Sequence, residues 1–209
     1  MLLIGRDMSP FVRRVVISLE ILGLPFERAE WATTDDKEKI AALYPMVRVP
    51  VAKLDDGEVL VDSAAILDWI DQEVGPQKAL TPASGAARRA VLQVCVITQS
   101  MLEKTIALLQ ERDLRPQEFV YTLKVEQRRD QMLAGLGMLE ARAATDGWLI
   151  EDRLTQADVT LATGFEFAAF MIPDLVTGAA FPNLAAHHER ARSLPGFQET
   201  SLEKYRMTF

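Results

Sequence analysis

The stretch Ser9-Pro10-Phe11-Val12-Arg13-Arg14-Val15, near the start of the chain, decides the predicted fold of the first third. Serine followed by proline is typical of a helix start, with serine as the N-cap and proline in the first turn. The apolar run Leu2-Leu3-Ile4 precedes it and ends at Gly5, which indicates a buried strand. Apolar residues at helical spacing continue to Leu22. The chain therefore begins as a strand followed by a helix.

Two further motifs extend this pattern. Val49-Pro50 enters a predicted hairpin of strands over 49–54 and 58–61, and Asp62-Ser63 opens a helix that ends at Gly75-Pro76. A strand over 26–31 and a short helix over 35–43 lie between the first helix and this hairpin. The resulting order, βαβαββα, puts two helix N-termini and a proline turn at one end of a small sheet. Because helix N-termini attract negative charge, this arrangement suits a small, anionic, peptide-like ligand.

The rest of the chain carries helical patterns only. Long helices are predicted over about 86–111 and 116–145, with a break at Arg115-Pro116, and shorter ones over about 155–171 and 183–193. We therefore expect an α/β domain over 1–76, a linker over 77–85 that is rich in Pro, Ser and Gly, and an all-helical domain over 86–209.

Composition and charge exclude several classes of protein. The net charge is −7, from 23 basic and 30 acidic residues, and no basic run appears, so a nucleic-acid partner has little electrostatic support. The single cysteine, Cys95, excludes a disulfide framework. No apolar run reaches the roughly 18 residues of a membrane span. His187 and His188 lack the spacing of a metal site and are expected to be exposed. We expect a cytoplasmic protein without a metal and without a membrane partner.

The combined motifs resemble the cytosolic glutathione transferases over nearly the whole length of the chain. The resemblance rests on four segments: 9–15, Arg48-Val49-Pro50-Val51, Asp62-Ser63-Ala64-Ala65-Ile66 and Thr155-Gln156-Ala157-Asp158-Val159-Thr160. It implies a thioredoxin-like N-terminal domain, an all-helical C-terminal domain and a homodimer. It also implies glutathione as co-substrate, and a bacterial-type enzyme with serine at the catalytic position.

Ser9 is the candidate catalytic residue. A helix N-terminus lowers the pKa of a thiol placed there, and a hydroxyl at the N-cap can donate a hydrogen bond to a thiolate. Glutathione would thus be held as its nucleophilic thiolate. An ordinary N-cap role explains the same Ser-Pro pair. One turn later, a solvated helix face is mildly favoured for Arg14, and a catalytic role for Arg13 stays open.

The resemblance assigns glutathione binding to seven residues: Ser9, Phe11, Arg48, Val49, Pro50, Asp62 and Ser63. In the family, the residue before a cis proline pairs its backbone with the cysteinyl part of glutathione, and Val49 matches that position. Asp62 and Ser63 match the residues that hold the ammonium and carboxylate groups of the γ-glutamyl end. A proline at the start of a strand and a helix cap account for these two motifs without any ligand.

Thr155 and Asp158 have the spacing of a capping box, which we interpret as structural. The predicted function is a detoxifying glutathione transferase. It would add the thiolate to a small hydrophobic electrophile or reduce an organic hydroperoxide. The alternatives are a glutathione-binding or ligand-carrying protein with little turnover, and an interaction scaffold that has lost the ligand.

Overall fold

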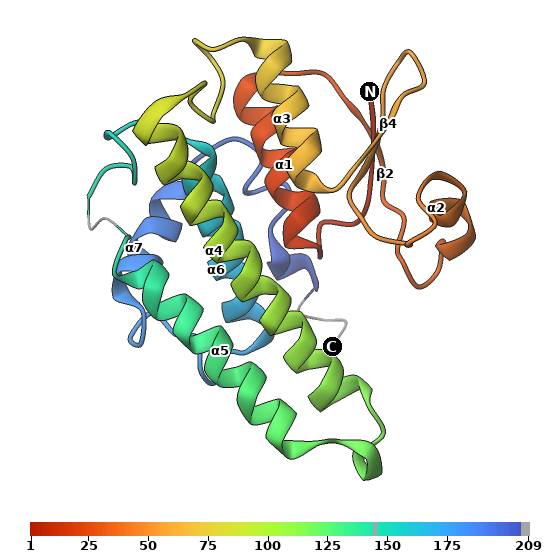
Figure 1. The fold of residues 1–209 in the computed structure, drawn as a ribbon, viewed down its shortest axis with the longest axis vertical. Helices are drawn as coiled ribbons and strands as arrows, with labels where there is room; N and C mark the ends of the chain where they lie inside the picture. The colour runs from red at the N-terminus through yellow and green to blue at the C-terminus, as the bar shows by residue number, and fades with distance from the viewer. Residues whose placement is uncertain (144–145, 206–209) are drawn as a thin grey trace. The chain divides into compact units, whose positions relative to one another are not determined.

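The computed structural model describes residues 1–143 and 146–205, and the contacts among residues divide the chain into two units (Figure 1). The first unit comprises Met1–Ala83 together with the segment that begins at Ala191, and the second comprises Ser84–Arg190. The segment after Ala191 thus makes its contacts with the first unit, although it follows the helices of the second unit in the sequence.

The first unit has the predicted βαβαββα order and is thioredoxin-like. Its strands are β1 (Leu2–Ile4), β2 (Glu27–Ala29), β3 (Val51–Lys53) and β4 (Val59–Val61), arranged β2-β1-β3-β4. β1 runs parallel to β2 and antiparallel to β3, and β4 is antiparallel to β3. The helices are α1 (Pro10–Leu22), α2 (Lys37–Leu43) and α3 (Ser63–Val74). The chain order confirms the predicted fold class.

The pleat of the strands gives the sheet two apolar faces. Leu3 and its cross-strand partner Ala52 pack against α1 and α3, which lie side by side in Figure 1. Ile4 and its partner Val51 point to the opposite face, where Ile40 of α2 covers them. Because side chains alternate along a strand, this register buries both faces with three-residue strands.

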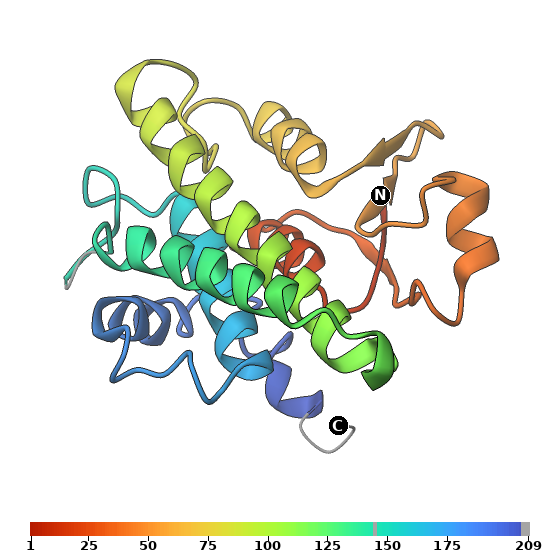
Figure 2. The same ribbon diagram turned by 60° about the horizontal axis from the view of Figure 1, so that its bottom comes forward.

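The second unit is helical. It contains α4 (Gly85–Leu109), α5 (Thr122–Glu140), α6 (Gln156–Met171) and α7 (Pro182–Ala191). α4 packs against both α5 and α6, and Figure 2 shows α4 and α5 side by side. Gly164 of α6 allows a close approach, since a side chain there would collide with the methyl group of Thr98 on α4.

The connection from α4 to α5 differs from the prediction. α4 continues as a π-helical turn, Gln110–Leu114, and a 3₁₀ turn, Gln117–Phe119, follows Pro116. α5 begins at Thr122 instead of 116. The reason is that the proline stops the first helix, and the carboxylate of Glu111 accepts the amide hydrogen of Tyr121 at 3.0 Å, which fixes the new start. The helix ends at Glu140, and the predicted end at 145 lies outside the described residues.

One helix in the described part of the chain, Gly85–Leu114, is long and apolar enough to cross a membrane by length and composition. In its most apolar window, 44% of the residues are buried inside the protein. Core helices of soluble proteins meet the same criterion, so this helix is weak evidence for a membrane span. Its buried residues pack against α5 and α6.

Candidate functional site

Ser9 caps α1 with extended backbone angles, φ −79° and ψ 119°, and Pro10 follows in the first turn. The amide of Val12 donates to the Ser9 Oγ over 3.4 Å, which is long for this type of bond. The side chain is half-buried, and no described residue accepts the hydroxyl hydrogen of Ser9. The Ser9 hydroxyl can therefore donate to an anion placed at the positive end of α1.

The Val49-Pro50 bond is cis, and Pro50 is buried at the entry to β3. Val49 lies close to the end of β1, because a Cβ built on Gly5 would come within 3.0 Å of the Val49 Cβ and would also collide with Val12 of α1. No described hydrogen bond uses the amide or the carbonyl of Val49. This backbone can therefore pair with an extended peptide, as an exposed sheet edge does.

Phe11 and Arg48 are the least informative members of the predicted set. Phe11 is half-buried in the first turn of α1, and Arg48 is exposed just before Val49. No described hydrogen bond or ion pair anchors either side chain. Their assignment to glutathione binding stays a prediction.

Asp62 and Ser63 start α3 with a strained backbone. Asp62 has φ 68° and ψ 141°, a region that non-glycine residues rarely adopt, and its Oδ1 accepts the amide hydrogen of Ala64 at 2.9 Å. Such outliers are concentrated at functional sites. The Asp62 side chain is exposed, whereas Ser63 is only 1% exposed. The exposed carboxylate can accept from an ammonium group.

Arg14 is buried, so the expectation of a solvated helix face is wrong. Its side chain is 2% exposed, and its Nε and Nη2 donate to the Ser63 hydroxyl over 3.1 and 2.7 Å. α1 is buried over almost all of its length, from Val12 to Leu19, so it has no solvated face for an arginine. In the sequence, the apolar residues on both sides of Arg13-Arg14 were the available signal that this arginine is buried.

Arg14 joins the start of α3 to α1, and Gly5 and Val12 join the Val49-Pro50 turn to α1. The three predicted motifs thus meet around one helix.

Arg13 is fully buried and contacts the C-terminal segment. Its Nε donates to the hydroxyl of Thr200 at 3.3 Å, and its guanidinium lies 6.0 Å from the centre of the Phe197 ring. This geometry is that of a cation–π contact. Arg13 therefore anchors the segment after Ala191 on α1.

A second contact joins the C-terminal segment to the loop before Ser9. Asp7 is 2% exposed, and its two carboxylate oxygens accept from Arg28 at 2.8 Å and from Lys204 at 2.6 Å. Arg28 of β2 also donates to the carbonyl of Gly5 at 3.1 Å. A buried carboxylate is tolerated when it is paired in this way. Sequence reasoning missed this cluster, because Asp7 and Lys204 are 197 residues apart.

Thr155 and Asp158 form the hydrogen bonds of a capping box at the start of α6. The fully buried Asp158 accepts from the amide and the hydroxyl of Thr155, both at 2.8 Å, and from the amide of Leu149 at 2.9 Å. Every contact of this carboxylate is within the second unit. Its geometry is that of a structural cap.

His187 lies in the same cluster, so its expected exposure is wrong. It is fully buried, its Nε2 lies 3.3 Å from the carbonyl oxygen of Asp158, and its ring meets Trp148 edge-on. Burial lowers the pKa of His187, although the nearby Asp158 opposes this shift. Among the residues described, no group of three or more His, Cys, Asp or Glu side chains is placed to hold a metal ion.

Comparison with known families gives two matches along the chain. The family model of the glutathione S-transferase N-terminal domain matches residues 3–78, and that of the C-terminal domain matches residues 97–195. Maleylacetoacetate isomerase of Pseudomonas aeruginosa is 28% identical over 165 residues, which is 71% of this chain and 72% of that protein.

Two solved structures are similar along almost the whole chain. A glutathione S-transferase of Methylobacterium radiotolerans in complex with glutathione sulfonate has 25% identity and a TM-score of 0.89, over 95% of this chain and 93% of that one. A glutathione transferase family member of Pseudomonas fluorescens with bound glutathione has 26% identity and a TM-score of 0.83, over 95% and 97%. Both domain matches and both structural similarities agree with the fold described above. The chain therefore belongs to the glutathione S-transferase superfamily.

Proposed function

We propose that this protein is a glutathione transferase that binds glutathione in its first unit and activates the thiol with Ser9. The observation that carries the proposal is the Ser9 hydroxyl, which caps α1 and has no acceptor among the described residues. A sulfur at this position would meet both the Phe11 amide, which has no described acceptor in the first turn of α1, and a hydroxyl donor. Both stabilise the thiolate relative to the thiol.

The remaining contacts of the proposed complex follow from groups that the fold leaves available. The Val49 amide and carbonyl would pair with the cysteinyl backbone of glutathione, while Asp62 would accept from its ammonium group. The Ser63 hydroxyl accepts from Arg14 and donates to the Asp62 carboxylate over a long 3.5 Å, and Asp62 also accepts from the Ala64 amide. The γ-glutamyl carboxylate would take over the hydrogen of that hydroxyl and would meet the amides of Ser63 and Ala65, which have no described acceptor. The similar structures with bound glutathione sulfonate and with bound glutathione support glutathione as the ligand of this fold.

The proposed chemistry uses the glutathione thiolate as the nucleophile. In conjugation, sulfur forms a bond to an electrophilic carbon, and either a leaving group departs with its electron pair or the resulting carbanion takes up a proton. With an organic hydroperoxide, sulfur attacks the outer oxygen and releases the alcohol. A second glutathione then reduces the sulfenic acid to the disulfide and water. Ser9 stabilises the charge on sulfur in both cases and forms no covalent bond.

The family also supports a cytoplasmic homodimer with a detoxifying role and a small hydrophobic electrophile as second substrate. These points are part of the proposal. Sedimentation equilibrium of the purified chain tests the dimer, and a panel of aryl halides, enals and alkyl hydroperoxides tests the substrate.

The direct test is the Ser9→Ala variant, with Ser84→Ala as matched control. Ser84 is also the N-cap of a helix, α4, and its side chain makes no capping hydrogen bond. The control therefore removes the same hydroxyl oxygen from a position outside the proposed glutathione site. At pH 7 we expect kcat/KM with glutathione to fall by about tenfold to a hundredfold in Ser9→Ala, the loss of one charge-assisted hydrogen bond. The control should stay within about twofold.

Equal activity of wild type and Ser9→Ala would remove Ser9 from the mechanism. Tight glutathione binding by calorimetry without turnover on the whole panel would favour a binding or carrier protein instead. Absence of both binding and turnover would favour a scaffold.

A further inference from the structure

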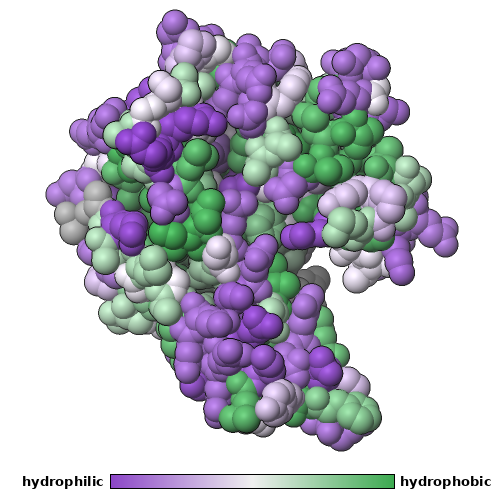
Figure 3. All heavy atoms as spheres, in the orientation of Figure 1, coloured by the Kyte–Doolittle hydropathy of each residue, from purple (hydrophilic) through white to green (hydrophobic). Residues whose placement is uncertain are grey.

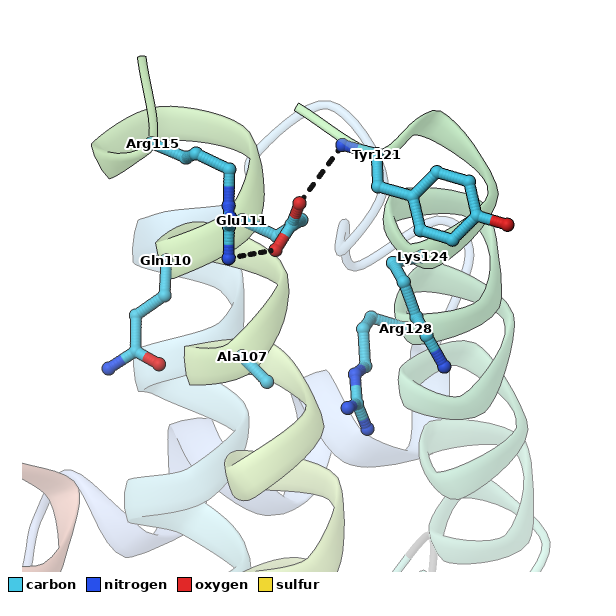
Figure 4. Close-up of a pocket in the computed structure, with 7 residues that line it drawn as sticks. All are labelled: Ala107, Gln110, Glu111, Arg115, Tyr121, Lys124 and Arg128. Atoms are coloured by element: carbon cyan, nitrogen blue, oxygen red, sulfur yellow. Dashed lines mark hydrogen bonds and ion pairs between the residues drawn. The ribbon is translucent and has the colours of Figure 1, made fainter. Parts of the chain in front are cut away.

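A cavity of about 440 Å³ lies within the second unit, between the end of α4 and the start of α5 (Figure 4). Its size falls in the range of small-molecule sites. Gln110, Glu111 and Arg115 line it from the α4 side, and Lys124 and Arg128 line it from α5. None of these residues belongs to the proposed glutathione site.

The cavity carries an excess of positive charge in an acidic protein. Its lining includes three cationic side chains and one carboxylate, whereas the whole chain has a net charge of −7. The carboxylate of Glu111 is already used: its Oε2 pairs with Arg115 at 3.0 Å, and its Oε1 accepts the amide hydrogen of Tyr121. Glu111 therefore neutralises Arg115 and leaves the charges of Lys124 and Arg128 uncompensated.

Lys124 and Arg128 lie one turn apart on the same face of α5, where two like charges repel each other. Figure 4 shows the Arg128 side chain in the space between the two helices, on the side where Ala107 of α4 lies, and the ammonium end of Lys124 over α5. Lys124 donates to the neutral side chain of Gln127 at 3.0 Å, and no described residue pairs with Arg128. An anion in the cavity would relieve this repulsion.

The wall opposite these cations has an unusual backbone. Gln110 and Glu111 belong to the π-helical turn Gln110–Leu114, and such turns occur frequently at functional sites. In Figure 3, hydrophilic side chains cover most of the surface around this end of the two helices, with hydrophobic ones at the tip. The exposed apolar side chains here include Leu114 and Phe119 of the connection between the helices and Leu123 at the start of α5.

We propose that this cavity binds a small aliphatic dicarboxylate. Two uncompensated cations match two carboxylates, and the fork of the Arg128 guanidinium suits bidentate pairing with one of them. Lys124, which also lines the cavity, supplies a point charge to the other carboxylate. A cavity of this volume is larger than inorganic phosphate needs, and it holds a chain of a few carbons between the charged ends.

Isothermal titration calorimetry of the full chain with succinate and with glutarate, at low ionic strength and saturating glutathione, tests the proposal. We expect a Kd below about 1 mM for at least one of the two dicarboxylates. Butyrate, with a single carboxylate, should bind at least tenfold more weakly. Arg128→Gln and Lys124→Gln should each raise the Kd at least fivefold.

Arg129→Gln is the matched control, because Arg129 is the neighbouring residue on α5, pairs with Asp130 at 3.0 Å and does not line the cavity. It should leave the Kd within twofold, as should Ser9→Ala, so failure of the transferase proposal is distinguishable from failure of this one. Thermal melting confirms that each variant is folded. No binding of either dicarboxylate, equal binding by Arg128→Gln and Arg129→Gln, or binding of inorganic phosphate as tight as that of succinate would each overturn the proposal.

Discussion

The N-caps of α1 and α6 use the same chemistry, but they differ in how completely the protein satisfies their hydrogen bonds. At α6, the Asp158 carboxylate is fully buried and accepts three hydrogen bonds, one of them from the Thr155 hydroxyl. At α1, the half-buried Ser9 accepts one long bond from Val12, and its hydroxyl hydrogen has no described acceptor. One cap is saturated by its own protein, while the other keeps a hydroxyl donor beside the Phe11 amide, which has no described acceptor.

This difference separates a structural cap from a candidate active site. A saturated cap contributes stability and has nothing left to offer a ligand. An open cap contributes less stability but presents oriented dipoles to an incoming anion. Mutations at α6 should therefore change stability, and mutations around α1 should change glutathione binding and activity.

The largest expected effect tests the saturated cap. Asp158→Ala leaves the buried amides of Leu149 and Thr155 without their acceptor, so we expect the free energy of unfolding to fall by about 2–4 kcal/mol. Urea denaturation measures it. Asp174→Ala is the control, because Asp174 is exposed and no described hydrogen bond or ion pair uses its side chain. A change within about 0.5 kcal/mol is expected there. Equal loss in both variants would contradict the assignment of the cap.

The second effect concerns the start of α3, beside α1. Arg14→Met removes the guanidinium group whose Nε and Nη2 donate to the Ser63 hydroxyl. We therefore expect the KM for glutathione to rise about tenfold, equivalent to about 1.4 kcal/mol, with a smaller change in kcat. Steady-state kinetics with glutathione as the varied substrate measures KM and kcat separately. Arg14→Lys should not restore the KM, because an ammonium group cannot reproduce the planar fork. A folded Arg14→Met protein with the wild-type KM would show that Ser63 needs no positioning.

The smallest effect is a pH dependence of stability at the saturated cap. The pKa of buried His187 is lowered from its ordinary value of 6.5, so the neutral ring stabilises the folded state above that pH. As the pH falls below about 6.5, the unfolded chain takes up a proton first. The folded state then loses about 1 kcal/mol per pH unit until the folded pKa is reached. Urea denaturation at pH 7.5, 6.5 and 5.5 should show this loss in the wild type.

The matched pair for this prediction is His187→Gln and His188→Gln. The first should abolish the extra acid sensitivity, and the second, whose ring lies beside Glu166, should retain it. Identical pH profiles for the two variants would rule out His187 as the titrating group.

Local signals in the sequence predicted the fold of the first unit and the position of its helix starts. Ser9-Pro10, Asp62-Ser63 and the apolar run Leu2-Leu3-Ile4 depend on neighbours in the chain, which sequence reasoning can evaluate. The delayed start of α5 depends on a side chain from the preceding turn, Glu111, and was missed.

The surroundings of the candidate site were less predictable because they depend on distant partners. A charged pair such as Arg13-Arg14 is usually solvated, and only the packing of α1 on both sides reveals that Arg14 holds Ser63. The pairing of Asp7 with Lys204 joins the two ends of the chain and has no local pattern. The buried His187 likewise depends on packing between α6 and α7.

The pKa of the glutathione thiol in the complex tests the central claim most directly. Ultraviolet absorbance of the thiolate, followed as a function of pH, measures it in wild type and in Ser9→Ala. The open cap of α1 predicts a value about two units below the roughly 8.5 of an ordinary thiol, and a rise of about one unit when the hydroxyl is removed. A bound thiol that titrates at or above its ordinary value, or that titrates identically in both proteins, would contradict the account.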